Sequence, residues 1–406
     1  MSDGPSIKPA GFAVILLFIA ACLGGAWWMF ARQAPGQNTG GSATGGADQP
    51  ATGGASTGAG TKPAVTIGFA YGSEKRKWIE WAAEAFARTP DGAGIALDLK
   101  PMGSFEAGQA IVRGDTSIHL WSPASSQALA VFKADWDVRQ GGEPFLMNES
   151  LALSPMAFVW WKDRLDAFQA KYKTVSFRTI GEALDEKTGW AGIARKPEWG
   201  LFKFAHTHPA QSNSGMTTLV GYAYEFHNTN RGLTLTQVLD PAFQTWMQHL
   251  AVSVTGLSNS TGTLMKEFVL KGPSAYDCIY VYESTAIDYL KSAEGRWGEL
   301  RIVYPQQNLW NEHPAVVLNA PWSSPAQRAA AKAFIKFLLS EPAQQMALKH
   351  GLRPSNPDVA VLTPDSPFTQ YQRYGLRNDL GSTGESPTPE VVLNLVQSWQ
   401  RSQGGR

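Results

Sequence analysis

A repeated alternation of apolar runs, polar turns and amphipathic runs between residues 65 and 132 constrains the fold more than any other feature. Runs with strand character cover 65–70, 95–99 and 118–121. Each run is followed by a turn that contains serine, and then by apolar residues at helical spacing. Strands that alternate with helices in this way usually pair in parallel. The pattern therefore predicts an α/β fold on a mostly parallel, doubly wound sheet.

Serine side chains follow the ends of these three runs. They are Ser73 after the first, Ser104 after the second, and Ser122 and Ser125 after the third. One such serine is most often a helix cap. Ligands of open α/β sheets, however, bind outside the carboxyl ends of the strands. Because the serines recur at equivalent places, they indicate a ligand site at that edge.

The stretch 204–219, FAHTHPAQSNSGMTTL, predicts a second contribution to this site. It has the pattern of a strand, a loop and a helix, with Ser212, Asn213 and Ser214 at the start of the helix. The first turn of a helix presents unpaired N–H groups and a partial positive charge, which favour an anion or another acceptor. The alternative is that Ser214 only caps the helix.

Composition and motifs exclude several classes of function. The chain has 406 residues, enough for two α/β lobes, and its net charge of +1 does not indicate a nucleic-acid partner. Residues 63–406, the predicted globular part, contain no G-x-S-x-G, H-E-x-x-H, C-x-x-C or P-loop pattern. His206, His208 and His313 leave a metal site open as an alternative, but histidines in loops more often have no such role. We therefore expect no enzyme, no cofactor and no metal.

The N-terminal region predicts attachment to a membrane. Residues 9–31 contain no charged side chain, and about 20 apolar residues suffice to cross a bilayer as a helix. We expect residues 1–8 in the cytoplasm, an uncleaved signal anchor at 9–31 and a flexible Gly/Ala/Ser/Thr linker at 32–62. Ile19–Cys22 leaves a second possibility open, a lipoprotein acylated at Cys22. In both cases we expect the globular part on the periplasmic or extracellular side of the inner membrane.

Several segments together resemble a known family. They are Ser73-Glu74-Lys75, Gly103-Ser104, the strand end at 121–126, His208–Gly215, the strand around 276–284, and the final block AFIKFLLS…Q…GLRP at 333–354. With these segments, residues 63–355 resemble the bacterial extracellular solute-binding proteins of the type II periplasmic-binding fold, which serve ABC-type importers. The similarity is greatest to the molybdate- and sulfate-like subgroup.

The resemblance implies a clamshell of two lobes. Lobe one would comprise 63–158 plus 283–355, and lobe two 159–282, with crossovers near Trp160 and Tyr282. Residues 356–406 lie outside the resemblance, and we expect them to pack on lobe one as a C-terminal extension. Carried over by position, the ligand-binding residues are Ser73, Ser104, Ser122, Ser125, Ser212, Asn213, Ser214, Tyr282 and Glu283. The carboxylates of Glu74 and Glu283 would be unfavourable in a site for a dianion such as molybdate, so the identity of the ligand stays open.

The implied function is capture of a small anionic or polar ligand in the cleft between the lobes, followed by closure. The expected partners are this ligand, an ABC-type permease or another membrane protein, and the bilayer through residues 9–31. The alternative on the same fold is a ligand-sensing or scaffold domain without transport. A closed or filled cleft would favour that alternative.

Overall fold

The computed structural model describes residues 64–252 and 257–403. The described residues all belong to one compact unit. The predicted cytoplasmic segment, membrane anchor and linker at 1–62 lie outside the described residues. Within the described residues, no helix combines the length and the apolar character that crossing a membrane requires.

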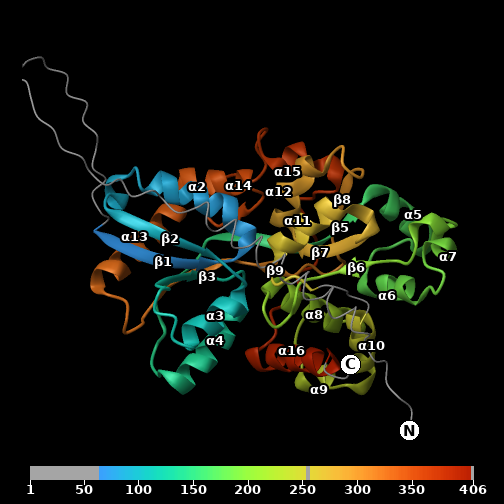
Figure 1. The fold of residues 1–406 in the computed structure, drawn as a ribbon, viewed down its shortest axis with the longest axis horizontal. Helices are drawn as coiled ribbons and strands as arrows, with labels where there is room; N and C mark the ends of the chain where they lie inside the picture. The colour runs from blue at the N-terminus through green and yellow to red at the C-terminus, as the bar shows by residue number, and fades with distance from the viewer. Residues whose placement is uncertain (1–63, 253–256, 404–406) are drawn as a thin grey trace, which may run out of the picture. The chain divides into compact units, whose positions relative to one another are not determined.

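The first sheet confirms the predicted alternation of strands and helices (Figure 1), but the prediction of a mostly parallel sheet is wrong, because strands from distant parts of the chain pair in antiparallel fashion. Its strands, in the order β2-β1-β3-β10-β4, are β2 (Ile95–Pro101), β1 (Val65–Tyr71), β3 (Leu120–Ser122), β10 (Pro314–Leu318) and β4 (Phe145–Ser150). β1 pairs in parallel with β2 and β3, whereas β10 runs antiparallel to β3 and β4. The carboxyl ends of β1, β2 and β3 therefore lie at one edge, where the serine-bearing turns begin.

Helices cover both faces of this sheet (Figure 1). They are α2 (Arg76–Phe86), α13 (Pro325–Leu338) and α14 (Glu341–Lys349) on one face, and α3 (Ser104–Val112) and α4 (Ser126–Arg139) on the other. Neighbouring residues of a strand point to opposite faces. Accordingly, Phe69 is buried in the core with Trp78 and Phe334, while Ala70 is buried in the core with Trp121 and Phe132.

The second sheet is built around β5 (Ala152–Trp161), an apolar strand of ten residues. The order is β11-β5-β7-β6, and β8 and β9 also pair with β5. These strands are β6 (Phe204–Ala205), β7 (Cys278–Tyr282), β8 (Leu300–Val303), β9 (Trp310–Asn311) and β11 (Arg353–Pro354). The helices in this part of the sequence are α5 (Lys162–Tyr172), α6 (Phe177–Asp185), α7 (Trp190–Ala194), α8 (Asn213–Phe226), α9 (Leu235–Val238), α10 (Pro241–Val252), α11 (Thr261–Lys271) and α12 (Glu283–Ala293).

Three passages join the two sheets, and the first two correct the predicted lobe boundaries; the third runs from β10 through α13 and α14 to β11. The chain leaves β4 and enters β5 at Leu151, and it leaves β9 and enters β10 at residues 312–313. Leu151 N donates a hydrogen bond of 3.2 Å to His313 O, so these two passages lie side by side. Trp160 and Tyr282, the predicted crossovers, both lie inside the second sheet. An apolar run predicts a strand, but it carries no information on which sheet the strand joins.

The C-terminal extension also differs from the prediction. It contains α15 (Pro367–Gln370) and α16 (Pro389–Gln403). We call the first sheet with α2, α3, α4, α13 and α14 the first part, and the second sheet with α5 to α12 the second part. α16 contacts α8, α9 and α10 of the second part and also α4 of the first part. Its buried residues Val391, Leu395 and Trp399 belong to the core that surrounds β5 and β7. The prediction that the extension packs on lobe one is therefore wrong for α16, which lies mainly on the second part.

A substitution at Gly351, which follows α14, tests how tightly the protein is packed at this position. Its φ is +77°, and a Cβ there would lie 2.7 Å from the Cβ of Ile287. We expect Gly351→Ala to lower the free energy of unfolding by about 3 kcal/mol, from backbone strain and overpacking together.

Gly295 is the matched control because its φ is +75° and it has open space around it. Gly295→Ala should cost about 1 kcal/mol, since only the strain remains. Both values are measured by urea unfolding. Equal losses for the two variants would contradict the packing described for Gly351.

Candidate functional site

The start of α8 gathers four buried hydroxyl groups. Ser214 Oγ lies 2.7 Å from Thr207 Oγ1, 2.7 Å from Thr261 Oγ1 and 3.1 Å from Ser212 Oγ. A hydroxyl donates one hydrogen bond and accepts two, so these contacts use the full capacity of Ser214. A Cβ at Gly215 would lie 2.3 Å from Thr207 O, so glycine lets the preceding loop approach the helix this closely.

The side chain of Asn213 connects the two parts of the molecule. Ser125 Oγ, at the start of α4, donates a hydrogen bond of 2.6 Å to Asn213 Oδ1. Asn213 Nδ2 donates to Asn311 Oδ1 at 2.8 Å and to Tyr282 OH at 3.1 Å. Nδ2 also lies 3.3 Å from Thr217 Oγ1. Both ends of the amide are therefore occupied by protein groups.

Two further helix starts are capped across the same boundary. At the start of α11, Gly262 N donates a hydrogen bond of 3.1 Å to Ser73 Oγ, which follows β1. At the start of α3, Phe105 N donates to Gln211 O at 3.2 Å. At these two helix starts, N–H groups that could bind an anion thus bind groups of the opposite part.

The space left among these side chains is very small, whereas an open cleft of about 670 Å³ lies beside it and shares with it Ser73, Met102, Gly103 and Ser260. The walls of the small space include Ser73, Ser104, Ser212, Asn213 and Tyr282, and its volume is about 10 Å³. One water molecule needs about 10–15 Å³. At these side chains the boundary is therefore closed, and the predicted ligand groups bind one another; we call this arrangement the closed form.

The structure brings seven of the nine predicted site residues to this boundary and leaves two outside it. Ser125 and Ser214 are joined to the cavity residues by the hydrogen bonds described above. Ser122 is buried in β3, where its Oγ has no hydrogen-bond partner. Glu283 is also fully buried, but it lies in an ion pair elsewhere. These two positions were carried over by strand-end location, which does not decide where a side chain points.

Glu283 has a structural partner in Arg353. The guanidinium donates from Nε to Oε2 and from Nη2 to Oε1, both at 2.9 Å, and Tyr304 OH also donates to Oε1. Burial raises the pKa of Glu283, whereas the contact with Arg353 opposes this shift. The bidentate pair fixes β11 to the start of α12 and engages both carboxylate oxygens with protein donors.

A buried charged cluster of Glu74, Lys75 and His313 borders the same boundary. Lys75 Nζ lies 2.6 Å from Glu74 Oε1 and 3.2 Å from His313 Nδ1, and it also donates to Pro123 O at 3.3 Å. Burial raises the pKa of Glu74, but Lys75 and His313 outweigh it and lower this pKa to about 2. Burial and Lys75 lower the pKa of His313. We infer an ionised Glu74–Lys75 pair beside a neutral imidazole.

Sequence reasoning did not assign this cluster or Thr261 to the site. The motif Ser73-Glu74-Lys75 was a visible signal, because two opposite charges follow a buried strand directly. Thr261 gave a weaker signal, since α11 was not predicted. No sequence signal placed His313 beside Glu74 and Lys75, because its position depends on the passage from β9 to β10. Its φ of +43° is unusual for a residue with a side chain.

The three histidines considered for a metal site have separate surroundings. His206 Nδ1 lies 2.7 Å from Thr207 O, His208 packs its ring 4.8 Å from the ring of Trp399, and His313 faces Lys75. In the part of the chain that the structure describes, no group of three or more His, Cys, Asp or Glu residues is placed to hold a metal ion. The positions of these three histidines do not support a shared metal site.

Comparison with known proteins identifies the class to which this fold and site belong. Residues 67–353 match the sequence profile of the family described as bacterial extracellular solute-binding protein. The chain therefore belongs to this family of extracellular solute-binding proteins. No curated protein matches the chain in sequence.

Solved structures show the same fold at low sequence identity. The sulfate-binding protein SubI from Mycobacterium tuberculosis H37Rv has 20% identity and a TM-score of 0.51, over 74% of this chain and 93% of its own. Iron-bound HitA from Pseudomonas aeruginosa has 15% identity and a TM-score of 0.55, over 84% and 99%. AfuA from Actinobacillus pleuropneumoniae, with fructose-6-phosphate bound, has 13% identity and a TM-score of 0.57, over 84% and 100%. These likenesses confirm the type of fold.

His206, beside the hydroxyl cluster, predicts a pH dependence of stability. Burial lowers its pKa from 6.5 to about 4. Between these values the unfolded chain binds more protons than the folded one, so stability falls as the pH falls from 6.5 to 4. We expect this residue to contribute a loss of about 3 kcal/mol across that range.

The comparison is urea unfolding of the wild type and of His206→Gln at pH 7 and pH 4.5. His206→Gln should lose less stability on acidification than the wild type. His350→Gln, at a partly exposed histidine, is the control and should follow the wild type. Parallel losses in all three proteins would contradict the assignment to His206.

Proposed function

We propose that this protein is a membrane-tethered solute-binding protein that captures a small anionic or polar solute between its two parts. The observation that carries the proposal is the meeting of Ser73, Ser104 and Ser125 with residues 212–214 at one buried boundary. Hydroxyls and amides from opposite parts can hold a polar solute only when the parts come together. Closure on the solute would then be the state that an ABC-type permease recognises.

The closed form suggests how a solute would enter. In the proposed mechanism the parts separate around the passages at Leu151 and His313, and the cross-boundary hydrogen bonds break. The solute then takes the place of Ser125 at Asn213 Oδ1, of Ser73 Oγ at the start of α11 and of Gln211 O at the start of α3. Because it replaces bonds that already exist, only its additional contacts shift the equilibrium toward closure.

The charges around the boundary favour a particular class of solute. Lys75 is neutralised by Glu74 at 2.6 Å, so the cluster brings no net positive charge toward the cavity. The remaining groups are neutral hydroxyls, amides and backbone N–H groups. We therefore propose a neutral polar solute or a monoanion in preference to a dianion.

A second candidate function rests on the volume of about 10 Å³. A boundary this full, with the amide of Asn213 saturated by protein groups, is also what a permanently closed domain requires. Such a domain would act as a scaffold for another membrane protein and would not carry a solute. If this alternative is correct, no solute should raise the melting temperature of the protein.

A panel of solutes separates the two functions. The full chain in lipid nanodiscs is unfolded thermally with sulfate, molybdate, a sugar phosphate, thiamin, amino acids or polyols. Binding to the folded state raises the melting temperature by linkage. We expect one class to raise it, whereas no shift with any class, at concentrations up to 10 mM (about 10⁴ times a micromolar Kd), would favour the scaffold.

Asn213→Ala tests the location of the site with the same assay. Loss of its amide should weaken binding of the active solute at least ~10-fold, because several buried hydrogen bonds are lost together. Asn394→Ala, on α16 and bonded to Glu390 O at 2.9 Å, is the control and should bind normally. Normal binding by Asn213→Ala would place the solute elsewhere.

The proposed tether makes a separate prediction. The full chain should sediment with bacterial membranes and resist extraction by carbonate, and Cys22→Ser should behave in the same way. Release of the Cys22→Ser variant into the soluble fraction would show that a lipid on Cys22, not a spanning helix, provides the attachment. Release of the wild type itself would contradict membrane tethering.

A further inference from the structure

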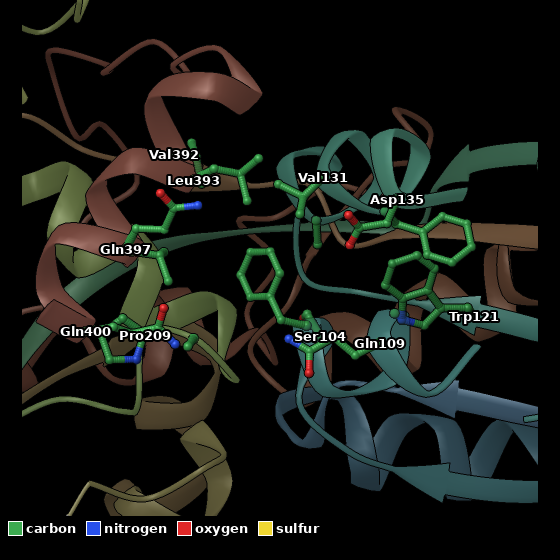
Figure 2. A pocket seen from close by; sticks show the side chains of 16 residues that line it. Ser104, Gln109, Trp121, Val131, Asp135, Pro209, Val392, Leu393, Gln397 and Gln400 are labelled. Carbon is green, nitrogen blue, oxygen red and sulfur yellow. The ribbon is translucent and has the colours of Figure 1, made fainter. Parts of the chain in front are cut away.

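A second cavity lies where α16 faces α3 and α4 (Figure 2). Its volume is about 190 Å³. Among the described residues, Ser104 borders both this cavity and the boundary site. The α16 wall begins at Val392, beyond the part of the chain that matches the family profile. The cavity is therefore a feature that the extension adds to the fold.

The cavity has an apolar interior and a polar rim. Interior side chains come from α3, β3, α4 and α16, and they are Phe105, Trp121, Ala128, Val131, Phe132, Val392, Leu393 and Val396. The exposed side chains in the lining, which form the polar rim, are those of Gln109, Asp135, Gln397 and Gln400. For scale, an apolar protein cavity of ~150 Å³ binds benzene. The space therefore matches a molecule with one six-membered ring.

One buried donor in this lining lacks a partner. The Trp121 side chain is 1% exposed, and its Nε1 makes no hydrogen bond with the described residues. In Figure 2 the indole nitrogen lies on the side of the ring toward Ser104 and Gln109. A buried N–H without an acceptor costs free energy, and an acceptor on an occupant would recover it.

The single charged group in the lining restricts the occupant further. The carboxylate of Asp135 lies at the rim, opposite Gln397 in Figure 2, and the lining contains no cation. An anionic occupant would be repelled by Asp135 without a compensating charge. The geometry points to a second binding site, for a neutral molecule with one aromatic ring and one hydrogen-bond-accepting oxygen.

Such a molecule would hold the two parts together. α4 belongs to the first part, whereas the extension before α16 is bound to the second part through Tyr224 OH, which donates to Glu385 O at 2.6 Å, and Glu385 N, which donates to Asn230 O at 2.7 Å. The ring of Trp399 also packs on His208. Because the occupant contacts α3, α4 and α16 at once, it favours the closed form. The site therefore acts as an effector site that is separate from the solute site.

The experiment uses benzyl alcohol, toluene and benzoate as probes of one ring with different substituents. Each is titrated by calorimetry into the full chain in nanodiscs, with empty nanodiscs as the blank. Benzyl alcohol should bind about five-fold more tightly than toluene, the effect of one hydrogen bond, and benzoate should not bind. Equal or tighter binding of benzoate would overturn the proposal, as would no binding of benzyl alcohol.

Three variants locate the binding. Val396→Phe fills the cavity from α16 and should weaken benzyl alcohol binding at least ten-fold. Val138→Phe makes the same change at an exposed position of α4, where Val138 is 87% exposed, and should bind like the wild type. Trp121→Phe should remove the preference for benzyl alcohol over toluene. Unchanged binding by Val396→Phe would place the probe elsewhere.

Hydrogen exchange gives an independent readout, and it distinguishes binding at the α16 cavity from binding at the solute site. Benzyl alcohol should slow exchange of the amides of α16 and α4 in the wild type and in Asn213→Ala. Slowing in the wild type but not in Asn213→Ala would show that the probe occupies the solute site, and would overturn the effector site. Failure of every solute in the thermal assay leaves the effector site unaffected.

Discussion

The closed form depends on the satisfaction of buried polar groups around Asn213. Its amide has no access to water, so each of its hydrogen-bonding atoms needs a partner inside the protein. Ser125 supplies the donor, and Asn311 and Tyr282 supply the acceptors. Separation of the two parts removes Ser125 and must bring in water or a solute in its place. The same amide therefore links closure to the occupancy of the boundary.

The charged cluster and the first two passages between the sheets are parts of one region. His313 contributes its carbonyl to the bond with Leu151 N and its imidazole to the contact with Lys75. Any rotation about the passages therefore changes the surroundings of the Glu74–Lys75 pair. A buried ion pair tolerates little loss of geometry, because desolvation of the charges offsets most of their attraction. The cluster thus restricts the positions that the two parts can take.

The extension adds a second connection to the molecule. The family match ends at residue 353, and α16 lies beyond it, with its buried face in the core of the second part. Through α4 it also contacts the first part. Opening must therefore break the contacts of α16 with α4 as well as the polar bonds around Asn213. The apolar and the polar contacts lie on either side of Ser104, which borders both spaces.

Local patterns in the sequence determined much of the fold and part of the site. Apolar runs located β1, β2 and β3, and polar residues after strands located Ser73, Ser104 and Asn213, because hydrophobic patterning and capping depend on neighbours in the chain. The sequence could not show that β5 and β7 both lie in the second sheet, or that Glu283 binds Arg353. Nor could it show that α16 crosses to α4 or that Thr261 joins Ser214. Those features were decided by tertiary structure alone, because they depend on contacts between residues far apart in the chain, which local spacing does not encode.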